Sequence, residues 1–107
     1  MATDIVVILC TAAPNVAEQM AEYLVNHKLV ACVNISPVHS VYRWKGSMCH
    51  DSEHLMIAKT TKGKSEAAVS AIRTLHSYEV PEIIVLPVVS GHAPYLDWVR
   101  KETSGTS

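Results

Sequence analysis

The segment from Leu75 to Val88 carries side chains that are well suited to chemistry. Its first half, His76 to Glu82, is a polar turn with an imidazole, a phenol and two carboxylates. Its second half, Ile83 to Val88, is almost continuously apolar and predicts a strand that is buried on both faces. Because Pro87 cannot donate a hydrogen bond, central strands avoid it. We therefore expect a sheet edge that another element covers, and in so short a chain a second copy of the protein is the simplest cover.

Aromatic and charged side chains elsewhere could add to this turn and form a cleft for a small ligand. Tyr42 and Trp44 share one strand face because successive strand residues point to opposite sides. Brought to Tyr78 at a subunit boundary, they would line an aromatic-walled polar cleft, a form that small-ligand sites often take. The alternative is an anchor between subunits, because Tyr and Trp dominate protein interfaces. The residues predicted for this cleft are Tyr42, Trp44, Glu53, Lys59, Tyr78 and Glu82.

A second group of soft ligands lies near the tip of a predicted hairpin. Cys49, His50 and His54 offer one thiol and two imidazoles. Their spacing is not the paired spacing of a four-ligand structural zinc site. The group is either an adventitious site for soft metals or a solvated hairpin. Three other histidines are expected to be isolated: His27, His39 and His92.

Composition excludes several classes of function. The net charge of the 107 residues is −1, which gives no basic surface for nucleic acid or for an anionic membrane. No apolar run reaches the roughly 18 residues of a membrane span, so we expect no membrane insertion. The start, Met1 to Asp4, lacks the basic region of a signal peptide. Three cysteines without C-x-x-C spacing favour a reducing cytoplasm over a disulfide framework.

No catalytic device is recognisable, so we expect a protein that is not an enzyme. The serines lack a nucleophile elbow. With four glycines, the chain contains no phosphate-binding loop. Paired carboxylates with acid–base spacing are also missing.

The elements that position these residues can be read from hydrophobic periodicity and turn residues. The pattern predicts a single domain, residues 1–107, of the α+β class: a ferredoxin-like β-α-β-β-α-β sandwich with its helices on one face and a short C-terminal helix. In the strand order 4-1-3-2, both strand prolines, Pro37 and Pro87, fall on edges. The predicted strands are 5–10, 29–35 with resumption over 40–44 after a bend at Pro37, 53–60, and 83–88. The predicted helices are 14–26, a second one capped by Ser65 and ending at 75, and 93–101, with a frayed tail over 103–107.

Five collinear motifs closely resemble the CutA family of divalent-cation tolerance proteins. The resemblance covers essentially the whole chain and implies a homotrimer whose long second and third strands pair with neighbouring subunits. It also implies an architecture similar to the PII signalling proteins, which bind small effectors at subunit clefts, and it implies no catalytic activity. The motifs are LVACVNI (29–35), YRWKG (42–46), KTT (59–61), HSYEVPEI (76–83) and YLDW (95–98).

The same resemblance implies a copper site. Bacterial members are thought to use the cysteine that ends the first strand and two adjacent histidines before the Tyr turn. Here these positions hold Cys10 and His76, but Leu75 replaces the first histidine, and Ser77 stands where relatives often have proline. Thiolate and imidazole are ligands that copper favours. The alternative is that Cys10 is a small buried hydrophobe and that His76 caps its helix.

The sequence therefore predicts a cytoplasmic, trimeric protein that binds copper or another divalent metal in a tolerance response. One alternative is a PII-like module whose clefts between subunits bind a small effector or pass a signal to a partner protein. Another is a protein that acts chiefly as a stable scaffold. Whether Cys10 and His76 lie at the same end of the sheet is not decided by the sequence.

Overall fold

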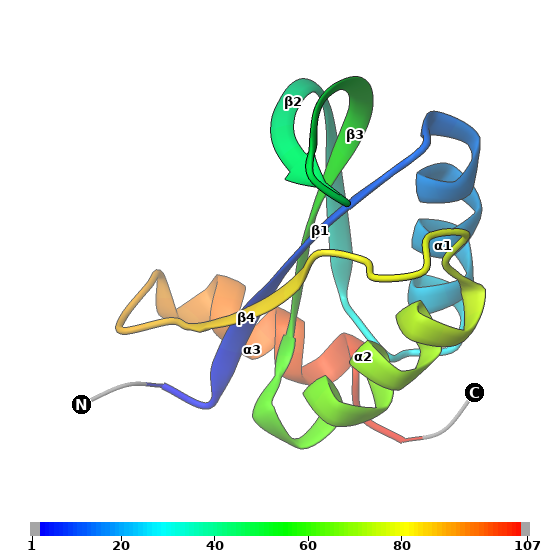
Figure 1. The fold of residues 1–107 in the computed structure, drawn as a ribbon. Coiled ribbons are helices and arrows are strands. Elements are labelled where there is room, and N and C mark those ends of the chain that lie inside the picture. The colour runs from blue at the N-terminus through cyan, green and yellow to red at the C-terminus, as the bar shows by residue number, and fades with distance from the viewer. Residues whose placement is uncertain (1–2, 106–107) are drawn as a thin grey trace.

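The computed structural model describes residues 3–105, which form one four-stranded antiparallel sheet and three helices (Figure 1). The elements are β1 (Ile5–Ala12), α1 (Pro14–Asn26), β2 (Cys32–Trp44), β3 (Ser47–Thr61), α2 (Lys62–Leu75), β4 (Ile83–Pro87) and α3 (Ala93–Glu102). The sheet order β2-β3-β1-β4 confirms the predicted order. Both prolines lie in edge strands, as predicted, because an edge strand can leave a missing N–H group unpaired on its outer side.

The hairpin of β2 and β3 is longer than predicted. The two strands pair in one continuous register from Cys32 opposite Lys59 to Trp44 opposite Ser47. The predicted interruption of the strand at Pro37 is wrong, since this residue pairs with His54 inside the ladder. A two-residue turn closes the hairpin, and both of its residues, Lys45 and Gly46, have positive φ angles of 50° and 81°. That is the turn geometry that matches the twist of two paired strands.

Two predicted helix features are corrected. Helix α2 begins at Lys62, directly after β3, so Ser65 lies inside the first turn and its hydroxyl donates to the Lys62 carbonyl at 2.9 Å. Thr103 is not frayed: it is 2% exposed, and its hydroxyl donates to the Val99 carbonyl at 2.8 Å. This bond ends α3 in an ordered way. The last part of the predicted tail, residues 106–107, lies outside the described residues.

One face of the sheet is covered by α1 and α2. Alternate residues of β1, among them Ile8 and Cys10, are at most 1% exposed and pack against the two helices. Leu24 of α1 and Ile72 of α2 complete this core at 0% and 1% exposure. The prediction of both crossover helices on one face is therefore confirmed.

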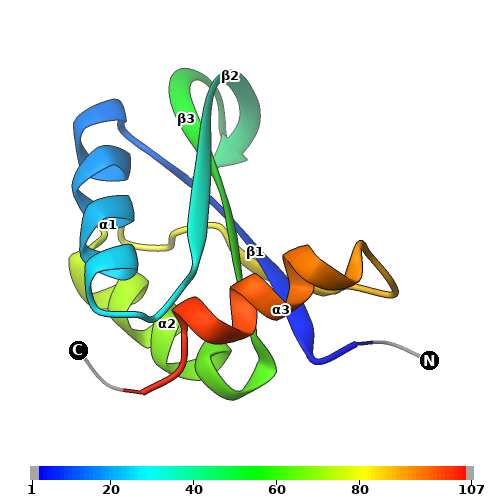
Figure 2. The same cartoon turned by 180° about the vertical axis from the view of Figure 1, so that it is seen from behind.

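Helix α3 lies against the opposite face, at one end of the sheet (Figure 2). Its buried residues Leu96 and Val99 pack with Ile5 of β1 and with Ala31 in a second, smaller core. The described helices include none that is both long enough and apolar enough to cross a lipid bilayer.

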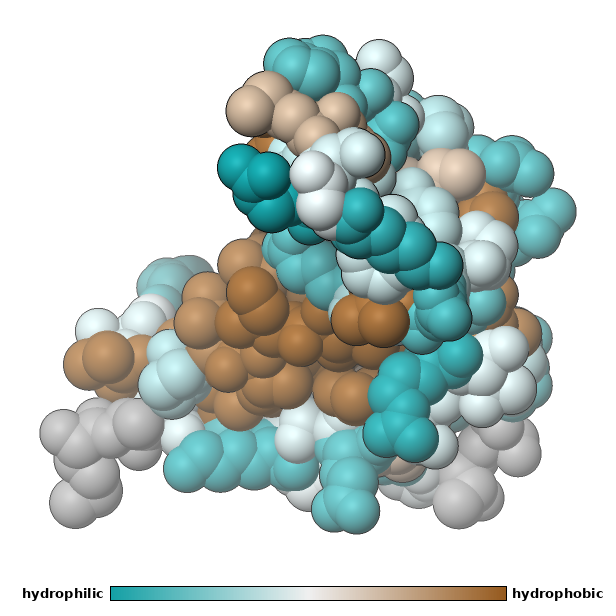
Figure 3. All heavy atoms as spheres, in the orientation of Figure 1, coloured by the Kyte–Doolittle hydropathy of each residue, from teal (hydrophilic) through white to brown (hydrophobic). Residues whose placement is uncertain are grey.

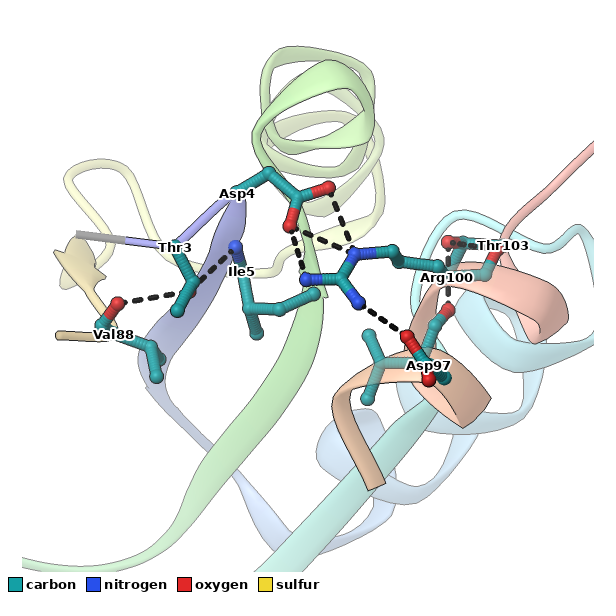
Figure 4. A network of polar contacts seen from close by, with 8 residues as sticks. Thr3, Asp4, Ile5, Val88, Asp97, Arg100 and Thr103 are labelled. Carbon is teal, nitrogen blue, oxygen red and sulfur yellow. Dashed lines mark hydrogen bonds and ion pairs between the residues drawn. The ribbon is translucent and has the colours of Figure 1, made fainter. Parts of the chain in front are cut away.

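Polar contacts fix this end of the sheet (Figure 4). Arg100 of α3 contacts Asp4 through two nitrogens, at 2.7 and 2.9 Å, and Asp97 through a third, at 2.7 Å. The hydrogen bond from Arg100 holds the pKa of Asp4 below its usual value. The Thr3 hydroxyl donates to the Val88 carbonyl at 2.8 Å and so ties β1 to the end of β4.

Around β4, an apolar surface is left uncovered (Figure 3). Ile84 and Leu86 of β4 are 45% and 43% exposed, and they lie opposite Leu9 and Val7 of β1 in the strand register. The Cα radius of gyration is 14.4 Å, against roughly 13 Å for an ordinary chain of this length. The chain is thus more extended than its length requires, and it carries an exposed apolar patch at β4.

Candidate functional site

A cavity of about 440 Å³ lies where the curled hairpin meets the turn between α2 and β4. Figure 1 shows the β2–β3 hairpin bending over at its tip above the sheet. The cavity walls come from the residue between β1 and α1, from both hairpin strands and from the polar turn. They are Ala13, Tyr42, Trp44, Asp51, Ser52, Tyr78, Glu79 and Val80.

Two hydrogen-bonded pairs, each of a tyrosine and a carboxylate side chain, hold the cavity walls together. The Tyr78 hydroxyl donates to Glu53 Oε2 at 2.7 Å, which joins the turn to β3. The Tyr42 hydroxyl donates to Asp51 across the hairpin. Because these bonds stabilise the protonated phenol, both tyrosines stay neutral at physiological pH.

The pKa values of the two phenols report the electrostatics of the cavity. The hydrogen bond to Asp51, followed by burial, raises the pKa of Tyr42 to about 12. Burial, followed by the hydrogen bond to Glu53, raises the pKa of Tyr78 further still. Glu53 is only 6% exposed. The negative charges of Asp51 and Glu53 therefore act together on this small region.

The structure brings together most of the residues predicted for the cleft. Tyr42, Trp44 and Tyr78 line the cavity, and Glu53 lies behind Tyr78. Lys59 is not part of it, because it lies six residues along β3 from Glu53, roughly 20 Å away. Its ammonium group is 3.9 Å from the Cys32 sulfur.

Glu82 is also outside the cavity wall. It lies close enough to Cys10 for its charge to raise the pKa of that thiol. Asp51 and Glu79, which the sequence analysis missed, provide the acidic groups of the wall instead. Asp51 could have been found, because it shares the strand face of Glu53 by the period of two. Nothing in the sequence pattern indicates that Glu79 turns into the cavity.

Cys10 and His76 lie at the same end of the sheet and share one acceptor. The Thr11 carbonyl oxygen is 3.7 Å from Cys10 Sγ and 2.8 Å from His76 Nε2. His76 Nδ1 accepts a hydrogen bond from the Tyr78 backbone N–H at 3.1 Å, so Nε2 is the nitrogen that donates. The ring therefore links β1 to the polar turn, while the backbone N–H of His76, and not its ring, caps α2 by donating to Ile72.

The two donors suit copper chemically, but both are engaged elsewhere. Cys10 is 1% exposed, and burial, with the nearby charges of Glu82 and Glu53, raises its pKa to about 12. The thiol is thus protonated at physiological pH. Within residues 3–105, no group of three or more His, Cys, Asp or Glu side chains is arranged to hold a metal ion.

A pair of histidines on the hairpin was missed by the sequence analysis. His50 Nδ1 lies 3.4 Å from His39 Nε2, because the two residues are diagonal neighbours across β2 and β3. The prediction that His39 is isolated is wrong. The predicted group of Cys49 with His50 is also wrong, since consecutive strand residues point to opposite faces. Two nitrogens about 3.4 Å apart can both reach one tetrahedral metal ion at bond lengths of about 2.1 Å, so this pair is a possible surface site for metal.

Comparisons of this chain with known proteins all relate it to one family. The family model described as "CutA1 divalent ion tolerance protein" matches residues 5–102. The divalent-cation tolerance protein CutA of Thermus thermophilus is 41% identical over 99 residues, which cover 92% of this chain and 96% of the relative. Protein CutA of Homo sapiens is 45% identical over 93 residues, 86% of this chain, and the chain spans about half (52%) of that relative's length.

Solved structures agree with the sequence relationship. The Thermus thermophilus divalent cation tolerance protein has a TM-score of 0.89 at 41% identity, covering 94% of this chain and 99% of that one. A PII-like protein CutA from Nostoc, solved in the apo form, has a TM-score of 0.89 at 37% identity, with 92% and 96% covered.

Proposed function

The chain belongs to the CutA family of divalent-cation tolerance proteins, and on that premise we propose that it is a cytoplasmic homotrimer that binds copper or another divalent metal without catalysing a reaction. The observation that supports a metal role is the convergence of Cys10 and His76 on one carbonyl oxygen. All three cysteines are free thiols, which suits a reducing compartment.

The uncovered face of the sheet supports the trimer. It presents Ile84 and Leu86 at more than 40% exposure beside the half-buried Val7 and Leu9. Large exposed apolar patches on soluble proteins mark interaction surfaces. The extended hairpin adds two long strands that can reach a neighbouring subunit. Three copies arranged around a common axis would cover each of these faces with another copy.

Copper binding at Cys10 and His76 requires a local exchange of partners. The thiol must lose its proton, and the His76 ring must release the Thr11 carbonyl. A soft metal ion favours both changes, because thiolate and imidazole are ligands that copper prefers. Since Leu75 supplies no further imidazole, any remaining ligands would be water or backbone oxygens.

An anaerobic titration with Cu(I) against a competing chelator tests this site. Cys10→Ala and His76→Ala should each remove one high-affinity equivalent per chain. The matched control is His39→Ala, which removes the surface histidine pair and leaves the converging donors intact. Equal stoichiometry and affinity in wild type, Cys10→Ala and His76→Ala would rule out the proposed site. If copper binding is lost only in His39→Ala, the metal binds at the hairpin instead.

A second candidate function is a PII-like module that binds a small effector. The observation that favours it is the 440 Å³ cavity, whose walls combine three aromatic side chains with a few polar groups. Native mass spectrometry of freshly purified protein should detect a retained small molecule, and Trp44→Leu should abolish that extra mass. Detection of the bare protein alone, over a range of buffers and growth conditions, would count against the effector.

A further inference from the structure

We infer that the cavity beneath the hairpin selects small organic cations, of the alkylammonium class, over neutral and phosphorylated molecules. This inference rests on the second proposal above, in which the cavity is an effector site. Three features of the walls carry it: their charge, their aromatic rings and the way their hydroxyl groups are bonded.

The charged side chains that line the cavity are all acidic. Of the eight residues that line it, Asp51 and Glu79 are acidic and none is basic. The buried carboxyl group of Glu53 adds to them from behind Tyr78. A phosphorylated ligand would have to enter against these carboxylates, and like charges repel. A cation would be attracted by all three.

The aromatic walls favour an organic cation in particular. Tyr42, Trp44 and Tyr78 come from two different segments and face the same space. The face of an aromatic ring attracts a cation that lies within about 6 Å of the ring centre. Trp44 already attracts such a group from its own chain, since the Lys45 ammonium nitrogen is 5.9 Å from the ring centre.

The two phenol hydroxyl groups of the cavity cannot readily serve an anion. Both tyrosine protons are donated to carboxylates, the first to Asp51 and the second to Glu53. The phenol oxygens therefore have only lone pairs left to offer a ligand. Lone pairs, carboxylates and ring faces all attract positive charge. The cavity therefore offers more hydrogen-bond acceptors than free side-chain hydrogen-bond donors.

A bare divalent metal ion fits the cavity less well than an organic cation. Calcium and magnesium need about six oxygen ligands in a defined geometry. The described residues offer no group of three metal-binding side chains here. An ammonium group with apolar substituents, by contrast, would satisfy the rings and also the apolar Ala13 and Val80.

Isothermal titration calorimetry with three small probes at constant ionic strength tests the inference. Tetramethylammonium, tert-butanol and pyrophosphate represent a cationic, a neutral and an anionic ligand. Wild type should bind tetramethylammonium at least about tenfold more tightly than the other two. Trp44→Leu and Asp51→Asn should each weaken that binding by roughly tenfold. Asp97→Asn, which removes a carboxylate next to Arg100 and far from the cavity, should leave it unchanged.

The outcomes separate this inference from the proposal on which it rests. If tert-butanol or pyrophosphate binds as tightly as the cation, and Trp44→Leu abolishes that binding, the cavity is an effector site and the cationic preference is wrong. If none of the probes binds, the effector proposal falls as well. Binding of tetramethylammonium that ignores both Trp44→Leu and Asp51→Asn would place the cation elsewhere and overturn the inference. Because Asp51→Asn keeps the shape of the side chain, it remains informative even if Trp44→Leu disturbs the hairpin.

Discussion

The two faces of the sheet are built from the same strands but are covered to very different extents. On one face, Ile8 and Cys10 are at most 1% exposed beneath α1 and α2. On the other, Ile84 and Leu86 remain more than 40% exposed, because α3 covers only the end near Ile5. The chain therefore covers most of one face of the sheet and only one end of the other. The uncovered part is where a partner surface has the most apolar area to bury.

The largest expected effect is the loss of the proposed trimer when a charge is placed on the open face. Leu86→Asp should reduce the protein to single chains, because burying an unpaired carboxylate in an interface is very costly. The matched control is Val85→Asp, in the same strand and at the same exposure (42% against 43%), but on the opposite face. Analytical ultracentrifugation should show trimers for Val85→Asp only. Intact trimers in both variants would mean that the open face is not the interface.

A core substitution should come next in size. Ile8→Ala should lower the free energy of unfolding by about 2–5 kcal/mol, because it leaves a cavity in a fully buried site. Leu9→Ala, on the open face, should lower the free energy of unfolding by a similar amount only in the assembled protein, where another copy would bury Leu9. Denaturant unfolding at several protein concentrations measures both. A Leu9→Ala cost that does not change on dilution into single chains would contradict the role given to this face.

The cysteines offer a chemical test of the same contrast in burial. Cys10 should react with iodoacetamide at pH 8 about a thousandfold more slowly than an ordinary thiol, because its pKa of about 12 leaves little thiolate. Cys49, on the hairpin, should react first, which mass spectrometry of partly labelled protein would show. Rapid labelling of Cys10 in the folded protein would mean that β1 opens at this end.

The raised pKa of Cys10 also predicts how stability changes at high pH. A group whose pKa is higher in the folded than in the unfolded state contributes stability that is complete below its unfolded pKa. For Cys10 that contribution should be lost as the pH rises from about 9 toward 12. The melting temperature of Cys10→Ala should therefore fall less steeply than that of wild type over this range. Identical slopes would remove the thiol as a cause.

The smallest effect is expected at the exposed ion pair that holds α3. The pKa of Asp4 is lowered by Arg100, so the contribution of this carboxylate is complete above its ordinary pKa and lost as the pH falls below about 4. Both partners are partly exposed (39% and 52%), and exposed pairs contribute little. Asp4→Asn should lower the melting temperature slightly at pH 7 and not at all near pH 2. A large loss at pH 7 would mean that α3 depends on this pair more than on Leu96 and Val99.

Much of the fold could be predicted because its signals are local. Continuous apolar runs predicted β1 and β4, helical spacing predicted α1 and α2, and the position of Pro37 and Pro87 predicted which strands are edges. Element ends were less certain. The polar tip of the hairpin, around His50 and Asp51, has no apolar alternation, so β3 was predicted to start six residues too late. Pairing with β2, and not burial, makes this segment a strand.

The candidate site could be predicted only in part, for a related reason. Tyr42 and Trp44 could be placed together because they share a face of one strand. Their meeting with Tyr78 depends on the curl of the hairpin, and Glu79 enters the wall through the path of a turn. Lys59 was included wrongly, because sequence proximity to Glu53 on one strand conceals a separation of roughly 20 Å.

By itself, the sequence determined the order of the elements and the edges of the sheet, since both follow from periodicity and from the missing N–H of proline. Only the tertiary structure decided which side chains meet across long sequence distances: His39 with His50, Glu53 with Tyr78, and Cys10 with His76 at the Thr11 carbonyl. Those contacts depend on strand register and on the curl of a hairpin. Each is set by the packing of the whole chain, so no short stretch of residues can specify it.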